Sequence, residues 1–195
     1  MSNKIKALIF GFTFSVLCSF ANFSTNSHSI SQKVLRIHII PNSDSPEDQI
    51  LKIKIRDRIL SEYQENLSTK KNITQAQKYI LQNLNNINKI IKEEIINNNL
   101  NYDFKTEFVN NTYFNTRYYQ NTVFPAGNYR ALKITLGAGV GQNWWCVLYP
   151  TVCISSASGT NNTTKIEEVL TPAEQKIVTS PKKYKIKFKI LELLT

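Results

Sequence analysis

The spacing of apolar residues changes along the chain of 195 residues, and each spacing predicts a different kind of element. Residues 34–40 (VLRIHII) alternate in the way that a half-buried strand does. Leu35, Ile37 and Ile39 fall on one face of that strand, whereas Arg36 and His38 share the other. The sequence therefore predicts a strand with one apolar and one polar face.

Two helices are predicted after this strand. Ser45 is a favourable N-cap residue and Pro46 fits the first helical position, so we expect a helix from residue 46 to about residue 67. Glu47 and Asp48 add favourable negative charge to its first turn. Asn72 opens a second helix, which ends at the asparagine run 97–99. Its apolar residues recur at steps of three and four: Ile73, Ala76, Ile80, Leu84, Ile87, Ile91 and Ile95.

Beyond residue 102 the apolar residues recur at every second position, which predicts strands at residues 104–108 and 129–136. A further strand or packed loop is expected at residues 144–149, after a glycine-rich segment at 137–141. The chain ends in KKYKIKFKILELL, where lysines alternate with apolar residues as in a half-buried strand. Residues 155–180 are rich in Ser, Thr and Asn and are expected to hold at most a short helix.

The predicted fold class is α+β, with two helices packed on one face of a mixed or antiparallel sheet and an N-terminal signal peptide. The expected division of the chain is a signal peptide at 1–21, a linker at 22–33, an α+β domain at 34–153, a flexible linker at 154–181 and a returning C-terminal strand at 182–195.

The N-terminal segment predicts export. Lys4 and Lys6 precede an uncharged apolar stretch of about 15 residues, and Ser19 and Ala21 fit the positions before a signal peptidase cleavage site. Retention as an uncleaved membrane anchor is the alternative, although the run is shorter than the ~20 residues that a spanning helix needs.

The balance of 24 Lys and Arg against 14 Asp and Glu gives a formal net charge of +10. Much of this charge lies in the C-terminal lysine segment, and no continuous basic stripe with interleaved aromatic residues is present. Nucleic acid is therefore not an expected partner of an exported chain. A lysine-faced edge strand suits edge protection or weak contact with an anionic membrane surface.

Loss of the signal peptide would remove Cys18 and leave Cys146 and Cys153. Their spacing allows a disulfide, and two neighbouring buried thiols are an equally suitable interpretation. The spacing fits no common zinc pattern, so we expect no metal and no cofactor.

One feature of the first helix is unusual. Lys52 and Arg56 point into the apolar arc of the helix, and buried charges need partners, for which Asp44 and Asp48 are the nearest carboxylates. Gln49 lies alongside. Arg36 and His38 would join this group if their strand face meets the helix. The group is either an ion-pair cluster that orients strand, loop and helix, or an exposed patch that contacts a ligand or partner.

A catalytic role would need a nucleophile beside His38. The combinations that the sequence offers are Cys146 with His38, or Ser43 and Asp44 with His38, as in a small extracytoplasmic hydrolase. Ser43 and Asp44 also suit turn and capping roles. No nucleophile elbow, phosphate loop or dinucleotide fingerprint is present, so a non-enzymatic role is favoured.

Trp144 and Trp145 are adjacent in the chain, so strand alternation predicts that they lie on opposite faces of the sheet. One of them then packs inward and the other is available to anchor a partner.

Several long motifs resemble one known family. The stretch RIHIIPNSDSPEDQILKIKIRD at residues 36–57 is similar to the opening motif of the stage II sporulation protein R family. The stretches YFNTRYY, FPAGNYRALKITLG, NWWCVLYPTVC and the closing YKIKFKILEL resemble the family in the same order. Pro41 departs from the small residue expected before Asn-Ser-Asp.

The resemblance implies a secreted signalling protein of endospore-forming Firmicutes, without enzymatic activity or cofactors. Such proteins are exported from the forespore into the space between the forespore and mother-cell membranes. There they activate a membrane-embedded aspartic protease that processes the sigma E precursor.

The resemblance also marks residues that either fold the domain or contact the protease. The first set is Arg36, His38, Asn42, Ser43, Asp44, Asp48, Gln49, Lys52, Arg56 and Asp57, and the second is Arg117, Trp144 and Trp145, with Cys146 and Cys153 as the possible disulfide.

Overall fold

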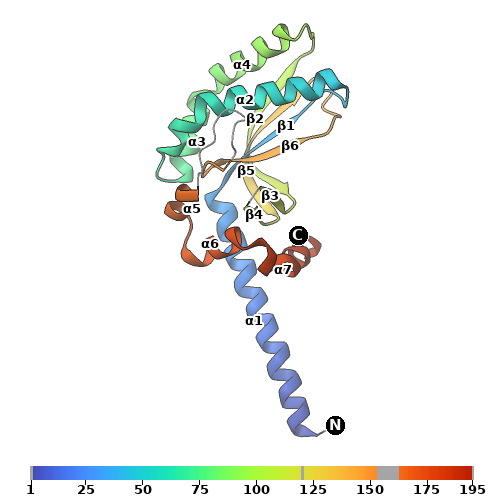
Figure 1. The fold of residues 1–195 in the computed structure, drawn as a ribbon, viewed down its shortest axis with the longest axis vertical. Helices are drawn as coiled ribbons and strands as arrows, with labels where there is room; N and C mark the ends of the chain where they lie inside the picture. Colours follow the sequence, from blue (N-terminus) through green and yellow to red (C-terminus); the bar gives the residue numbers. More distant parts are fainter. Residues whose placement is uncertain (1, 120, 153–162, 195) are drawn as a thin grey trace.

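The computed structural model describes residues 2–119, 121–152 and 163–194 of the chain, without the side chains of residues 163–165. A long N-terminal helix, α1 (Asn3–Lys33), extends away from an α+β domain (Figure 1). The mixed sheet of this domain confirms the predicted fold class.

The main sheet contains β1 (Leu35–Ile40), β2 (Phe104–Phe114), β5 (Gly127–Leu136) and β6 (Trp144–Tyr149) in the order β2-β5-β1-β6. β1 and β5 are parallel, whereas β1–β6 and β2–β5 are antiparallel. β3 (Arg117–Tyr119) and β4 (Thr122–Phe124) form a separate small hairpin.

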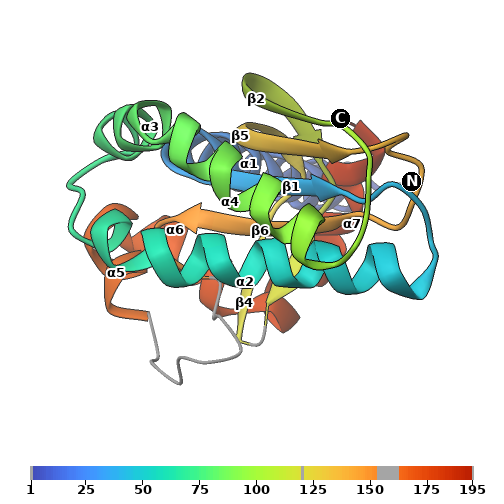
Figure 2. The same ribbon diagram turned by 90° about the horizontal axis from the view of Figure 1, so that it is seen from above.

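Three helices cover one face of the sheet: α2 (Pro46–Ser68), α3 (Ile73–Gln82) and α4 (Leu84–Asn97). α2 begins where the sequence predicts, because the Ser45 side chain accepts a hydrogen bond from the backbone N–H of Asp48. Leu35, Ile37 and Ile39 lie on this face, fully buried against the apolar stripes of the helices. The predicted second helix is interrupted at Asn83, whose side chain donates to the carbonyl of Tyr79. Figure 2 shows α2 and α4 in front of the strands, with α2 running in about the same direction as β6.

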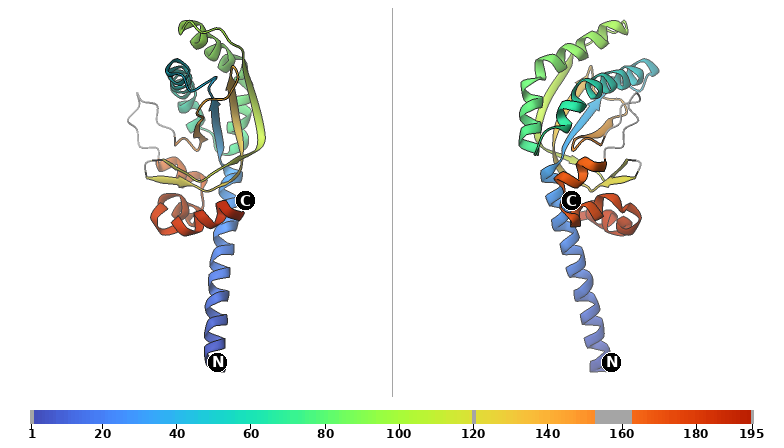
Figure 3. Two further views of the ribbon diagram at one scale, coloured as in Figure 1. Left: turned by 90° about the vertical axis from the view of Figure 1, so that its right-hand side faces the viewer. Right: turned by 60° about the vertical axis from the view of Figure 1, so that its left-hand side comes forward.

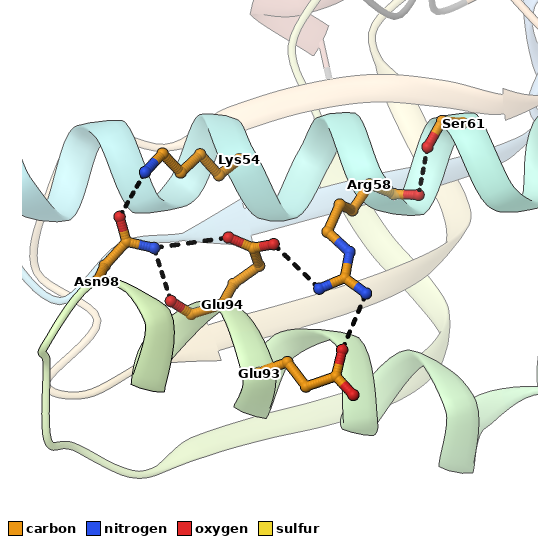
Figure 4. Close-up of polar contacts among 6 residues, drawn as sticks. All are labelled: Lys54, Arg58, Ser61, Glu93, Glu94 and Asn98. Atoms are coloured by element: carbon orange, nitrogen blue, oxygen red, sulfur yellow. Dashed lines mark hydrogen bonds and ion pairs between the residues drawn. The ribbon is translucent and has the colours of Figure 1, made fainter.

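A polar bridge joins α2 to α4 above this core. Arg58 donates to Glu93 at 2.9 Å and to Glu94 at 3.0 Å, and Lys54 donates to Asn98 at 2.7 Å (Figure 4). Lys54 and Arg58, which point away from the apolar arc of α2, therefore fix the position of α4 relative to α2.

The second half of α1 and three C-terminal helices cover part of the opposite face: α5 (Thr163–Val169), α6 (Pro172–Thr179) and α7 (Pro181–Leu194). Phe23, Ile30 and Val34 enter a second buried cluster there. Lys33 forms an ion pair of 2.7 Å with Glu174 of α6, which is buried. The end of α1 is thus fixed to the domain by both apolar packing and a charged contact.

The C-terminal segment corrects the sequence prediction. Residues 182–194 form helix α7 rather than a strand, because Tyr184, Phe188 and Leu191 make a helical stripe that packs on the second cluster. Residues 22–33, expected to be a linker, continue α1 as helix. The described part of the expected flexible linker at 154–181 forms α5 and α6.

The first part of α1 has the length and composition of a membrane span. Within the described residues, α1 is the one helix that is long and apolar enough to cross a membrane. Its most apolar window of 18 residues has a mean hydropathy of 1.6. A signal peptide and a membrane anchor both fit such a helix.

Candidate functional site

The sheet divides the first predicted set of residues into two groups. Asn42, Ser43, Asp44, Asp48, Gln49 and Lys52 gather where β1 ends and α2 begins, which we name the loop cluster. Arg36 and His38 lie on the opposite face of β1, away from α2. The strand face that bears Arg36 and His38 therefore does not meet this helix, so these two residues do not join the loop cluster.

Asp48 is the centre of the loop cluster. Its carboxylate is buried and accepts hydrogen bonds from Asn42 Nδ2 at 2.8 Å, Ser43 Oγ at 2.6 Å and Tyr102 OH at 2.8 Å. Burial favours the neutral acid, but these donated bonds outweigh it and hold the pKa of Asp48 below its usual value. The carboxylate therefore fastens the turn, the helix and the segment before β2 together.

The glycine-rich segment after β5 packs directly against this turn. Asn42 Oδ1 accepts from the backbone N–H of Ala138 at 2.9 Å, and the N–H of Gly141 donates to the carbonyl of Pro41 at 3.2 Å. Gly137 has φ +52°, and a Cβ there would lie 2.2 Å from Asn42 Oδ1. Gly137 and Gly141 are thus explained by close approach of the chain to the turn.

Within the described part of the chain, Lys52 is held without a direct carboxylate contact. Its ammonium donates to Gln49 Oε1 and to the carbonyl of Gln142, rather than to Asp44 or Asp48. Asp44 instead accepts from Gln49 and from the backbone N–H of Gln142. Burial lowers the pKa of Lys52, with the nearby Asp44 acting in the opposite direction. The loop cluster is thus internally hydrogen-bonded, but Lys52 does not form the ion pair with Asp44 or Asp48 that the sequence suggested.

Arg56 lies beyond the cluster at the sheet surface. It forms an ion pair of 2.7 Å with Asp57, and its guanidinium carbon lies 5.4 Å from the ring centre of Trp144. Trp144 packs on the buried cluster between the sheet and α2, whereas Trp145 packs on the second buried cluster, on the opposite face of the sheet. The prediction that the two tryptophans occupy opposite faces is confirmed.

Arg36 is fully buried on the second face, inside a group of aromatic rings. Its guanidinium lies 4.1 Å from the ring centre of Phe114 and 4.8 Å from that of Tyr129, and it donates to Tyr119 OH at 2.7 Å. Among the described residues it has no carboxylate partner, and its Nε and Nη1 have no hydrogen bond. The ring faces supply the negative potential that stabilises the charge.

His38 is stacked against Trp145 next to this group, with ring centres 3.5 Å apart. Burial, followed by the positive charges of Lys133 and Arg117, lowers the pKa of His38 to about 4. Neither ring nitrogen has a hydrogen-bond partner among the residues that the structure describes. His38 is therefore neutral near pH 7 and supports the indole ring.

The geometry does not assemble the catalytic combinations that the sequence suggested. Cys146 pairs with Ile37 in the sheet and packs on the α2 side, whereas His38 pairs with Trp145 and packs on the other side. Cys146 is also disulfide-bonded and Cys18 is a free thiol. Cys153 lies outside the described residues, so its pairing with Cys146 stays a prediction. Ser43 donates to Asp48 rather than to His38.

Within the described ranges, no group of three His, Cys, Asp or Glu residues is placed to hold a metal ion.

The sequence prediction missed Tyr102 and Gln142 as parts of the loop cluster, and Tyr119 and Lys133 as neighbours of Arg36 and His38. Glycine spacing at 137–141 was the available signal for the Gln142 segment, whereas the two tyrosines carry no local pattern that links them to Asp48 or Arg36.

These features define the class as a small α+β domain behind an N-terminal apolar helix that fits a signal peptide or anchor. Its polar residues at the β1–α2 turn serve internal hydrogen bonds. Residues 31–159 match the family model described as Stage II sporulation protein R, and the chain belongs to this family.

A curated relative supports the assignment. The chain is 40% identical over 124 residues to "Stage II sporulation protein R" of Bacillus subtilis (strain 168). The match covers 64% of this chain and 55% of the relative, so the chain spans about half the length of the curated relative that it matches. No solved structure matches the chain.

Proposed function

We propose that this chain is an exported sporulation signal that activates a membrane-embedded aspartic protease, which then processes the sigma E precursor. In this proposal the protein is made in the forespore and acts in the space between the forespore and mother-cell membranes, without an enzymatic activity of its own. The observation that carries the proposal is the family match, which covers the strands β1 to β6 and the helices α2 to α4. The apolar N-terminal helix supports export.

The surface that best suits a protein partner is the patch around Trp145, formed by His38, Arg117, Lys133 and Trp145. Arg117 is exposed, and its guanidinium carbon lies 5.6 Å from the ring centre of Trp145, which is half-buried. Lys133 pairs with His38 across the β1–β5 register, so both lie on this face. Arg and Trp are the residues that most often dominate the energy of protein interfaces.

The loop cluster suits this role less well. Its carboxylate, amide and hydroxyl groups already bind one another or the backbone. Breaking those bonds to bind a partner would leave the buried Asp48 carboxylate without its donors, at a cost of at least about 1–3 kcal/mol. We therefore assign the loop cluster to folding and the Trp145 patch to partner contact.

The test is complementation of a sporulating strain that lacks the protein, with processing of the sigma E precursor followed by immunoblot. We expect Arg117→Glu to reduce processing strongly at an unchanged level of exported protein, because it reverses charge at the centre of the proposed contact. Lys89→Glu, an exposed position on α4, is the matched control and should process normally.

Two outcomes would contradict the proposal. If the wild-type chain restored no processing of the precursor, the proposed activating role would be excluded. Equal processing by Arg117→Glu and Lys89→Glu would retain the role but remove the Trp145 patch as the contact surface.

A further inference from the structure

The first half of α1 leaves the domain as an uncovered apolar helix. The side chains of residues 2–19 are exposed, and Phe23 is the first buried side chain of the helix. The apolar window of 18 residues corresponds to about 27 Å of helix, close to the ~30 Å of a bilayer core. If this part enters a membrane, the domain begins at the membrane surface.

α7 lies across α1 at this point (Figures 1 and 3). Lys187 Nζ donates to the Ser19 hydroxyl at 2.7 Å and to its carbonyl at 3.1 Å. The Phe23 ring stacks on Tyr184 at 5.6 Å and meets the edge of Phe188 at 5.3 Å. α7 is therefore fixed at the level where the uncovered part of α1 ends.

The outer face of α7 combines lysines with large apolar side chains. Ile186, Leu193 and Leu194 are 77%, 76% and 70% exposed. Lys182, Lys183, Lys185 and Lys189 are exposed on the same helix. A face of this composition is typical of helices that lie in the interface of an anionic bilayer, where apolar side chains enter the acyl boundary and lysines reach the headgroups.

A groove beside α7 adds polar groups at the same level. Its volume is about 310 Å³, and it lies between α1, α6 and α7. Its lining includes Lys176, Lys187, Asn22, Asn26 and the aromatic ring of Tyr184. Asn26 Nδ2 donates to Asn22 and Lys187 Nζ donates to Ser19, so the groove offers mainly the positive charge of Lys176 and Lys187. Two ammonium groups suit the phosphate of a lipid headgroup.

We propose that α7 and this groove form a docking surface for an anionic phospholipid bilayer, with the first half of α1 inserted in the same membrane. The lysine-rich C-terminal segment then holds the domain in a fixed orientation on the membrane. This role does not depend on the activation of a protease.

The experiment places a fluorophore on α7 of the full chain. Ile186→Cys, in a Cys18→Ser background under non-reducing conditions, is labelled with an environment-sensitive dye. The protein is inserted in vesicles of phosphatidylcholine alone, or of phosphatidylcholine mixed with phosphatidylglycerol, that contain spin-labelled lipid as quencher. The control label is Ile96→Cys, at an exposed position of α4.

We expect several-fold stronger quenching at residue 186 than at residue 96, and only in the anionic vesicles. The triple variant Lys182→Glu/Lys185→Glu/Lys189→Glu should abolish the quenching. A matched triple variant of exposed lysines on α3 and α4, Lys78→Glu/Lys89→Glu/Lys92→Glu, should retain it. Far-ultraviolet circular dichroism checks that both triple variants fold.

Quenching at residue 186 that equals the weak quenching at residue 96 in anionic vesicles would overturn the proposal. Quenching that is the same with and without phosphatidylglycerol, or that survives the α7 charge reversal, would also overturn it. Insertion of α1 alone gives neither the lipid dependence nor the charge dependence, so it cannot imitate the expected result.

Discussion

Replacement of Asp48 tests whether the loop cluster stabilises the fold. In Asp48→Ala, three side-chain donors lose their acceptor: Asn42, Ser43 and Tyr102. Each unsatisfied donor costs about 1–3 kcal/mol when it is buried. All three donors are partly exposed, so water replaces some of the loss. We therefore expect a total loss of about 3 kcal/mol.

Asp48→Asn removes the negative charge of the side chain but keeps a hydrogen-bond acceptor, so it separates the contributions of the two. The amide oxygen can still accept from Asn42 and Ser43, and the amide nitrogen can donate to the Tyr102 hydroxyl. Because charge-assisted hydrogen bonds are roughly twice as strong as neutral ones, we expect this variant to lose about half as much stability as Asp48→Ala. Glu47→Gln is the matched control, since Glu47 is exposed in the same helical turn and contributes only ~0.5 kcal/mol through the helix dipole.

The assay is thermal unfolding of the full chain in detergent, followed by near-ultraviolet circular dichroism. For a chain of this size, a loss of about 3 kcal/mol lowers Tm by roughly 6–12 °C. Equal Tm values for Asp48→Ala and Glu47→Gln would refute the reasoning.

The lowered pKa of Asp48 adds a pH dependence of known sign. A carboxylate with a lowered pKa in the folded state contributes stability above its unfolded pKa, and this contribution disappears as the pH falls through the folded pKa. The stability difference between wild type and Asp48→Asn should therefore narrow in acid. A difference that widens in acid would contradict the assigned cause.

Three further predictions concern other parts of the structure. Gly137→Ala should destabilise the protein by at least ~2 kcal/mol in thermal unfolding, because its φ is +52° and the added Cβ meets Asn42; Gly11→Ala, in open space, should change Tm little. Arg58→Met should cost about 1 kcal/mol in denaturant unfolding, since its ion pairs are partly exposed, and an unchanged midpoint would contradict this. His38 should remain neutral by NMR down to a pH of about 4. Because the unfolded chain takes up that proton near pH 6.5, stability should fall as pH decreases between these values.

The β1–α2 region shows what local sequence can predict. Ser45, Pro46 and the acidic first turn predicted the start of α2 correctly, because N-capping depends on residues within one turn of the helix. The alternation of β1 predicted its two faces, and the adjacency of Trp144 and Trp145 predicted their separation. These features follow from the periods of helix and strand alone.

Helix α7 shows where the same reasoning fails. Its lysines and apolar residues alternate with a period of two, which predicts a strand, but Tyr184, Phe188 and Leu191 also fit a helical stripe. The packing surface offered by α1 and α6 selects the helix. Tertiary contacts of this kind cannot be inferred from the segment itself.

The division of the candidate site has a similar cause. The sequence indicates that Arg36 and Ile37 point to opposite faces, but not which face α2 covers. The expected carboxylate partner of a buried charge was wrong for Lys52, which donates to Gln49 and to the carbonyl of Gln142. Arg36 lies on the other face, where Phe114 and Tyr129, distant in sequence, surround it. Contacts between strands far apart in the chain decide such environments.

The most direct test of the central claim is a reconstitution in proteoliposomes that contain the membrane-embedded protease, its sigma E precursor and, where added, the purified full chain. Gel electrophoresis measures the rate at which the precursor is shortened. We predict rapid shortening only when the chain is present, with a slower rate for Arg117→Glu and an unchanged rate for Lys89→Glu. A rate that is the same with and without the chain would contradict the proposed activating function.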